Sequence, residues 1–313
     1  MCTGRLILPN ESVSMAETMG LFLGGSTIDC IYLVDQPPGR NEKITADRQL
    51  TCTGGPSSNA AITFSVLGGK ATLVSCLGLH PLSSIARNEL KTYGVDHIDL
   101  CPKYLSVPTV SSILVSKSNG DRSVVSINAK EIHNQNLSFR AFSLMDYKTA
   151  LFDGQYIEIA TKTARGCRNA GIHTILDGGS WKPGTEDLIH HIDTAICSSK
   201  FKPPKTTTPD EALEWLHDHD ILRAAITRGE KSILVAENGN RFEIFPPQLN
   251  PARDTLAAGD IFHGAYAYYQ SKDPAERFGD HLNNAAKIAA KSCAHFGPRK
   301  WVKDLKANMG RSY

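Results

Sequence analysis

Short apolar runs alternate along the chain with longer segments of helical periodicity. Such an alternation predicts a three-layer α/β domain with a largely parallel central sheet. Ligands in this architecture bind beyond the carboxyl ends of the strands, where glycine-rich turns and helix N-termini gather. The runs expected to form strands are Leu21–Leu23, Ala71–Cys76, Thr149–Phe152, His173–Leu176, Thr194–Cys197, Ala224–Thr227 and Ser232–Ala236.

Two stretches break this rhythm and predict a second, smaller sheet. Residues 31–53 read as extended, and the runs Val110–Val115 and Ser123–Ile127 flank Asn119-Gly120. An Asn-Gly pair between two such runs is a strong hairpin signal. We expect strands inserted at residues 31–53 and 108–128 to form a lid near the ligand face, which could also supply a homodimer surface. A hairpin without such a role is the alternative.

The composition excludes several classes of partner. The 313 residues are 41% hydrophobic and 21% charged, and 34 Lys and Arg balance 32 Asp and Glu for a net charge of +2. Such a balance gives no overall electrostatic field that would attract nucleic acid or a membrane surface. No stretch approaches the roughly 18 uninterrupted apolar residues of a membrane span. We therefore expect neither nucleic acid nor a membrane as a partner, although a local basic cluster could still hold a phosphorylated ligand.

The cysteines and the first residues bear on the compartment. The eight cysteines include no CxxC pair and no Cys/His pair at zinc spacing, which predicts free thiols in a reducing, cytoplasmic compartment. Residues 1–19 read as a polar extension, since their apolar run Leu6–Leu8 is too short for a signal-peptide core. The folded domain is expected over residues 20–313.

The segment Asp254–Asp260 carries the clearest chemistry. Its small residues Ala257, Ala258 and Gly259 precede a helix that the apolar spacing places near Gly259. A small-residue turn entering a helix lets backbone N–H groups approach an anion, which the helix dipole also favours. Asp260 beside such a site is explained by base catalysis in phosphoryl transfer to a hydroxyl, or by the preference for acidic residues in a first helical turn. The residues alone leave these interpretations level.

This segment closely resembles the carboxy-terminal signature of the ribokinase-like (PfkB) carbohydrate kinases, with DTLAAGDIFHGA at residues 254–265. The resemblance implies a ribokinase-like three-layer αβα fold with a small β lid. It implies ATP-dependent phosphorylation of a hydroxyl on a sugar or sugar-derived molecule. In the family pattern, Asp260 is the catalytic base, and the backbone of Ala257, Ala258 and Gly259 forms the anion hole.

A second match lies far upstream. The stretch Gly54-Gly55-Pro56-Ser57-Ser58-Asn59 resembles the family's G-G-x-x-x-N motif, which implies that Gly54, Gly55 and Asn59 contact substrate hydroxyls. Paired glycines permit close backbone approach, and an Asn amide offers both a donor and an acceptor. The same residues also suit a turn that opens a helix over Ser57–Leu67. Pro56 stands where many sugar kinases have Asn.

Three further side chains are candidates for the acceptor site. Asp29 closes Gly24-Gly25-Ser26-Thr27-Ile28-Asp29, which resembles the family's G-x-x-x-x-D, whose Asp binds substrate hydroxyls. Arg122 resembles the arginine of the lid hairpin that reaches toward the transferred phosphate or the substrate. Asp153 lies at the end of another predicted strand. A surface Asp29 and a solvated Arg122 are the alternatives.

The nucleotide side matches the family less closely. Thr227 and Gly229 lie in TRGEKS, which corresponds to the family's T-x-G-x-x-G turn near the nucleotide phosphates, with Ser in the last position. Asn284 falls in a later helix that the resemblance places near the adenine. The family's N-x-x-E motif is replaced by Cys197–Phe201. The resemblance implies ATP and Mg²⁺ as cofactors, with activation by a monovalent cation left open. The metal ligands are unknown, because Ser cannot replace a carboxylate's charge.

Three other functions each depend on one feature of the sequence. A nucleoside acceptor would need an aromatic platform, for which Tyr32 or Phe64 is available. A kinase-like binding or regulatory protein without turnover is suggested by the altered N-x-x-E stretch and opposed by Asp260. A nucleotide-binding dehydrogenase would need G-x-G-x-x-G after the first strand, which is absent.

Overall fold

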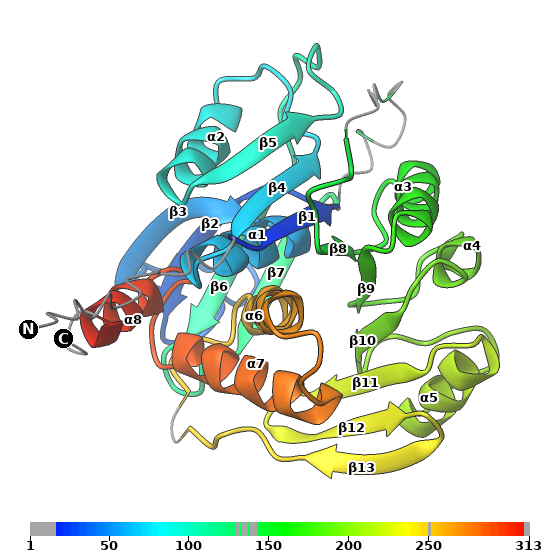
Figure 1. The fold of residues 1–313 in the computed structure, drawn as a ribbon. Coiled ribbons are helices and arrows are strands. Elements are labelled where there is room, and N and C mark those ends of the chain that lie inside the picture. The colour runs from blue at the N-terminus through cyan, green and yellow to red at the C-terminus, as the bar shows by residue number, and fades with distance from the viewer. Residues whose placement is uncertain (1–16, 129–131, 133–136, 138–142, 250–251, 310–313) are drawn as a thin grey trace, which may run out of the picture.

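Nine strands form the main sheet of the computed structural model, which describes residues 17–128, 132, 137, 143–249 and 252–309. They are β1 (Met19–Leu23), β4 (Lys70–Ser75), β5 (Val95–Asp99), β8 (Thr149–Phe152), β9 (His173–Gly178), β10 (Thr194–Ser198), β11 (Arg223–Arg228), β12 (Lys231–Glu237) and β13 (Asn240–Ile244). Their order across the sheet is β13-β12-β11-β10-β9-β8-β1-β4-β5 (Figure 1). Neighbours from β11 to β5 pair in parallel, and β12 and β13 add antiparallel pairs. The predicted largely parallel sheet is confirmed.

Helices cover both faces of the main sheet and produce the three predicted layers (Figure 1). The helices α3 (Ile157–Asn169), α4 (Thr185–Ile189) and α5 (Pro209–Asp218) lie on one face, and α1 (Pro56–Val66), α6 (Ala258–Lys272) and α7 (Phe278–Cys293) lie on the other. Each face buries its own apolar cluster. Because successive residues of a strand point to opposite faces, Leu21 and Phe22 of β1 belong to different clusters. The helices α2 (Ser83–Thr92) and α8 (Trp301–Met309) add Leu90 and Trp301 to the cluster around α1 and α6.

A second sheet of four strands lies beside the main one. Its strands are β2 (Thr27–Val34), β3 (Arg48–Gly54), β6 (Val110–Ser116) and β7 (Arg122–Ser126), in the order β3-β2-β6-β7. The strands β6 and β7 form the hairpin that Asn119-Gly120 predicted. The sheet begins at Thr27 rather than at residue 31, so Asp29 lies within a strand and not in the loop that follows β1. We call these four strands the small sheet.

One face of the small sheet packs against the turn that follows α7. Ile31, Cys52, Ile113 and Val115 form a buried cluster with Phe296 from that turn. The edge strand β7 is exposed along its whole length. The small sheet is mixed, because β2 and β6 pair in parallel, and it packs on the turn after α7 while its edge strand stays open to solvent.

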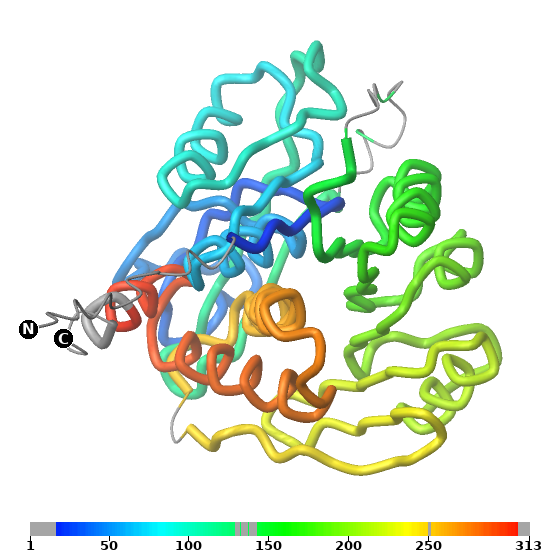
Figure 2. The backbone as a smooth tube through the Cα atoms, viewed as in Figure 1, coloured from blue at the N-terminus to red at the C-terminus, as the bar shows by residue number. Residues whose placement is uncertain are grey.

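The order of strands reverses between β1 and β8. After β1 the sheet grows through β4 to β5 on one side, and after β8 it grows through β9 to β11 on the other. A reversal of this kind opens a crevice at the carboxyl ends of the strands. The chain leaves β1 for the small sheet and returns as α1 (Figure 2), so the small sheet and the start of α1 both connect to this crevice.

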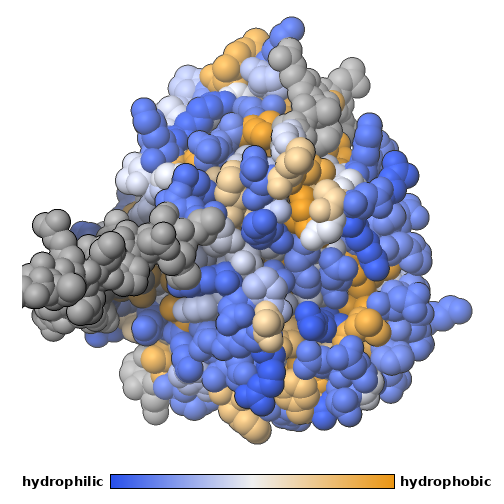
Figure 3. All heavy atoms as spheres, viewed as in Figure 1, coloured by the Kyte–Doolittle hydropathy of each residue, from blue (hydrophilic) through white to orange (hydrophobic). Residues whose placement is uncertain are grey.

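The cysteines of the described residues are free thiols, as expected, and all but Cys30 are buried. Residues 1–16 of the expected extension lie outside the described residues. Polar residues dominate the face of the molecule in Figure 3, with apolar residues scattered among them. Within the described part of the chain, no helix has the length and apolar character needed to cross a membrane.

Candidate active site

The helix α6 begins without a side-chain cap. Its N-cap residue Ala257 has a left-handed backbone with φ 60°, and the N–H of Ala258 donates to the carbonyl of Thr255 at 3.3 Å. Gly259 is exposed, and a Cβ built there would meet no atom within 4 Å. Because the first N–H groups of a helix lack partners within the helix, this turn offers donors and open space to an anion. The predicted helix start near Gly259 is confirmed.

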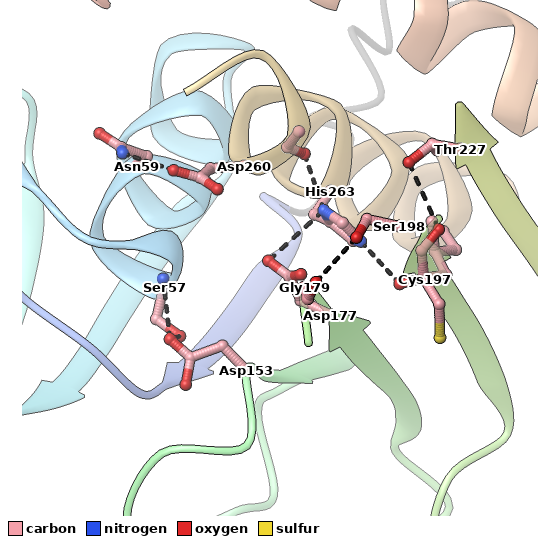
Figure 4. A network of polar contacts seen from close by, with 12 residues as sticks. Ser57, Asn59, Asp153, Asp177, Gly179, Cys197, Ser198, Thr227, Asp260 and His263 are labelled. Atoms are coloured by element: carbon pink, nitrogen blue, oxygen red, sulfur yellow. Dashed lines mark hydrogen bonds and ion pairs between the residues drawn. The ribbon is translucent and has the colours of Figure 1, made fainter. Parts of the chain in front are cut away.

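Asp260 and Asn59 meet at the starts of α6 and α1. Asn59 Nδ2 donates to Asp260 Oδ2 at 2.6 Å (Figure 4). Burial raises the pKa of Asp260 to about 7, the charge of Asp177 adds to the rise, and the hydrogen bond from Asn59 opposes it. A carboxylate with a pKa near neutral accepts a proton more readily than an ordinary one.

The paired glycines leave room for the Asp29 carboxylate and for the loop after β1. A Cβ at Gly54 would overlap the Asp29 carboxylate. Gly55 has φ 93°, and a Cβ there would come within 2.5 Å of the carbonyl oxygen of Gly25. Thr27 Oγ1 donates to Asp29 Oδ1 at 2.6 Å, and burial raises the pKa of Asp29. Any larger residue at position 54 or 55 would displace these groups.

Asp153 holds three parts of the chain together. Its Oδ2 accepts from the backbone N–H of Gly25 at 2.7 Å and from Ser57 Oγ at 3.0 Å, and its Oδ1 accepts from the N–H of Gln155 at 2.9 Å. The side chain is buried and points toward Ser57 in Figure 4. The carboxylate that we expected to contact an acceptor is thus occupied by donors of the chain itself, and it ties the loop after β1 to the start of α1.

Arg122 connects the small sheet to the segment before α6. Its Nη1 donates to the carbonyl oxygen of Thr255 at 3.1 Å and to Thr255 Oγ1 at 2.9 Å. Thr255 Oγ1 donates in turn to the carbonyl of Gly120, in the hairpin turn, at 3.2 Å. The guanidinium charge lowers the pKa of Asp260. The arginine is therefore directed toward the anion turn and held there by Thr255.

The carboxyl ends of β10 and β11 are joined to each other. Thr227 Oγ1 donates to the carbonyl of Cys197 at 3.3 Å, and the N–H of Ser199 donates to the carbonyl of Thr227 at 3.0 Å. Gly229 has φ 68° with no atom within 4 Å of a Cβ position. Asn284 stands apart on α7, half-buried, and accepts from Lys287 Nζ at 3.3 Å. Gly229 thus borders open space directly after β11, two residues beyond Thr227.

The stretch that replaces N-x-x-E makes contacts within the turn. Cys197 is buried against Gly178. Ser198 Oγ donates to the carbonyl of Gly179 at 2.7 Å and accepts from the N–H of Lys200 at 3.1 Å. Among the residues whose positions are described, no three His, Cys, Asp or Glu side chains gather as a metal site.

Two buried residues that we did not single out from the sequence lie under the anion turn. His263 Nδ1 lies 2.7 Å from the carbonyl oxygen of Gly259, and Nε2 lies 2.9 Å from that of Ile196. Carbonyl oxygens only accept, so each ring nitrogen of His263 faces an acceptor. The Asp177 carboxyl group lies 3.4 Å from Nδ1 (Figure 4), and burial raises the pKa of Asp177. Asp177 ends an apolar run as Asp153 does, so the same signal was present in the sequence.

Comparison with known proteins agrees with this arrangement. Residues 21–302 match the model of the pfkB family carbohydrate kinases. A ribokinase from Dictyostelium discoideum is 22% identical over 306 residues, covering 88% of this chain and 94% of the relative. The crystal structure of a putative ribokinase from Agrobacterium tumefaciens superposes with a TM-score of 0.79 at 21% identity, covering 95% of this chain and all of that one. The structure of Arabidopsis thaliana ribokinase complexed with ribose and ATP gives a TM-score of 0.70 at 19% identity, covering 93% and 99%. The chain adopts the ribokinase-like fold and belongs to the pfkB family of carbohydrate kinases.

Proposed function

We propose that this kinase transfers the γ-phosphoryl group of ATP to a hydroxyl of a sugar or sugar-derived molecule, with Asp260 as the base. The observation that carries the proposal is the position of Asp260. Its carboxylate, with a pKa of about 7, stands in the first turn of an uncapped helix directly after the open Gly259. The proposed base therefore lies directly beside the turn that is proposed to bind the phosphoryl group.

The chemistry requires one proton transfer and one exchange of bonds at phosphorus. Asp260 accepts the hydroxyl proton as the hydroxyl oxygen forms its bond to the γ-phosphorus, and the bond from that phosphorus to the β–γ bridging oxygen breaks to release ADP. The N–H groups at Ala257, Ala258 and Gly259 stabilise the charge on the transferring oxygens. ATP supplies the phosphoryl group, and its phosphates with water would hold most of the coordination of Mg²⁺, as is usual for this ion.

The acceptor is proposed to lie between the small sheet and α1. The Asp29 carboxylate can accept from two neighbouring hydroxyls, and Asn59 can donate or accept. Gly54 and Gly55 keep the backbone close to both residues. The ribose and ATP named for the Arabidopsis structure support a sugar acceptor and ATP as donor in this chain.

Arg122 and the small sheet are proposed to enclose the reacting groups. The contact of Arg122 with Thr255 places a positive charge beside the anion turn. Enclosure removes water that would otherwise compete with the sugar hydroxyl for the phosphoryl group.

Asp260→Asn tests the proposal. Loss of a general base commonly lowers turnover by about 10²–10⁴-fold, so kcat should fall by this factor while sugar and nucleotide affinities stay near those of the wild type. ADP release with and without Mg²⁺, over sugars, sugar acids and nucleosides, identifies the acceptor. Asp280→Asn is the matched control, because Asp280 also stands in a first helical turn, that of α7, but pairs there with Arg277 at 2.7 Å.

Equal effects of the two substitutions on kcat would mean that Asp260 only stabilises the first turn of its helix, and would refute base catalysis. Tight ligand binding by the wild type without turnover on any acceptor would favour the binding or regulatory alternative.

A further inference from the structure

Arg299, in the turn after α7, makes three contacts with separate parts of the chain. Its Nη2 donates to Asn59 Oδ1 at 2.8 Å and to the carbonyl oxygen of Thr53 at 2.8 Å, and its Nε donates to Glu89 Oε1 at 2.8 Å. The side chain is 11% exposed, and that of Glu89 is 17% exposed. A charged pair of such low exposure is stabilising only when its hydrogen bonds are well satisfied, as they are here.

Glu89 and Arg299 together hold the end of β3. Glu89 Oε2 accepts from the N–H of Thr53 at 2.6 Å, while Arg299 donates to the carbonyl of the same residue. Thr53 directly precedes Gly54 and Gly55. The ion pair therefore fixes the strand of the small sheet that leads into the proposed acceptor loop.

The contact with Arg299 also determines which way the amide of Asn59 points. An arginine has only donors, whereas an amide presents an oxygen at one end and an N–H₂ group at the other. With Oδ1 facing Arg299, Nδ2 faces Asp260, as observed. Without Arg299, the amide could turn its oxygen toward the carboxylate, where two acceptors would repel each other.

We propose that Arg299, held by Glu89, is a positioning residue that orients the amide of Asn59 toward the base and links this orientation to the end of β3. Its role in turnover rests on the proposed function, because Asp260 must be the base for its orientation to matter. The hydrogen bonds that Arg299 makes to Asn59, Thr53 and Glu89 do not reach Asp260 directly, so its effect passes through Asn59.

Several charged groups surround the two ends of this network. Asp260 faces Asp177 of β9, His263 of its own helix and Arg122 of β7, and none of these is altered by a change at position 299. Arg299 faces Glu89, with the charge of Asp29 near both. Since the hydrogen bond from Asn59 lowers the pKa of Asp260, loss of that bond raises it.

Arg299→Met tests the proposal in the full-length chain by two readouts. The first is a ¹³C NMR titration of Asp carboxyl carbons, with the Asp260 signal assigned by its loss in Asp260→Asn. The second is kcat against pH. We expect the midpoint of Asp260 and the acid limb of kcat to move together to higher pH. Below the limb, turnover should fall about tenfold for every pH unit by which the midpoint moves, and above it the loss should be small.

Further variants make the test specific. Arg87→Met removes an arginine of α2 that pairs with Asp99 instead of Glu89, and it should leave the titration midpoint of Asp260 in place. Arg299→Lys should restore the midpoint in part, because one ammonium can reach Asn59 but cannot span all three partners. In an Asn59→Ala background, Arg299→Met should not move the midpoint further. Glu89→Gln replaces Arg299→Met if the latter does not fold.

The proposal is overturned if Arg299→Met leaves the Asp260 midpoint unchanged and lowers turnover equally at every pH, as a purely structural residue would. The NMR titration needs no turnover, so it decides the role of Arg299 even if the wild type phosphorylates no acceptor. Failure of the proposed function and failure of this inference are thereby separated.

Discussion

Asn59 Nδ2 lies 2.6 Å from Asp260 Oδ2, although the two residues are 201 positions apart in the sequence. The contact depends on the close crossing of α1 and α6. At this crossing Gly264 packs on the backbone of Ala60, and a Cβ at position 264 would overlap its carbonyl oxygen and approach Thr63 Cβ to 2.8 Å. The glycine of the family signature thus has a packing role, because it sets the distance between the base and its amide partner.

Two glycines of α6 should respond oppositely to the same substitution. Gly259→Ala places a methyl group in open space, so the free energy of unfolding should stay within about 0.5 kcal/mol of the wild type, as for most exposed changes. The methyl would fill the proposed phosphoryl seat, and kcat should fall at least about tenfold if one contact worth about 1.4 kcal/mol is lost. Urea unfolding and initial rates measure the two effects.

Gly264→Ala is the control for that substitution. The new methyl would overlap backbone, and overpacking of this kind typically costs about 1–3 kcal/mol. A Gly259→Ala enzyme with normal kcat would contradict the assignment of this turn as the anion hole.

Turnover should rise with pH through about 7, the pKa to which burial raises Asp260. The base acts only when deprotonated, so kcat should fall about tenfold for each pH unit below this value. The measurement is kcat at saturating substrates from about pH 5 to 9, in overlapping buffers. A profile that stays flat across this range would exclude Asp260 as the titrating base.

Stability should show the opposite dependence on the same carboxylate. The pKa of Asp260 is about 7 in the folded state against an ordinary value of 3.8, so the folded state binds the proton more tightly. The contribution of the protonated Asp260 carboxyl group to the free energy of unfolding is therefore fully present below pH 3.8 and is lost as the pH rises to about 7. Asp260→Asn removes this loss, and its Tm should exceed that of the wild type at about pH 8 and match it at about pH 3.5. An equal Tm at the higher pH would contradict the burial of the charge.

Arg122→Met should disconnect the small sheet from the anion turn. Loss of the contacts with Thr255 removes a positive charge that lowers the pKa of Asp260. We expect a lower kcat and an acid limb displaced to higher pH, with little change in the free energy of unfolding because the side chain is exposed. Arg48→Met, on β3 of the same sheet, is the control, since Arg48 lies over Phe296 instead. Identical kinetics for both variants would refute the role of Arg122.

His263→Leu should destabilise the fold by leaving Asp177 buried without its partner. A buried polar group left without its partner typically costs about 1–3 kcal/mol. Removing both polar side chains in His263→Leu/Asp177→Leu should recover part of this cost, as urea unfolding at neutral pH would measure. The two side chains would not act as a pair if the double variant lost as much free energy of unfolding as the two single variants lose together, or more.

The sequence predicted the parts of the fold that have a strong local pattern. The buried parallel strands and the Asn119-Gly120 hairpin were predicted because apolar runs and turn residues are local signals. The strands β5 and β13 were not, because each lies at an edge of the main sheet and carries polar residues such as Asp96 and Glu243, which hide the apolar alternation.

The same distinction applies to the candidate site. The motifs around Asn59 and Asp260 were found because each is a contiguous pattern, and the structure brings these two residues into contact. Arg299 belongs to none of the motifs found in the sequence, and its partner Glu89 is 210 positions away. No periodicity or spacing connects two such residues, so only the folded chain shows that they share a hydrogen-bond network with the proposed base.

The position of Arg299 in the sequence also determines when, during synthesis of the chain, the hydrogen-bond network becomes complete. Domains tend to fold as their residues emerge, from the N-terminus onward, and Asn59 and Glu89 are made long before the rest of the network. A growing chain that has just completed Asp260 still lacks the side chain that orients Asn59. The proposed base would acquire its complete hydrogen-bond network only after the turn that follows α7 has been made, so a chain that stops short of Arg299 would bind nucleotide at a site poorly prepared for transfer.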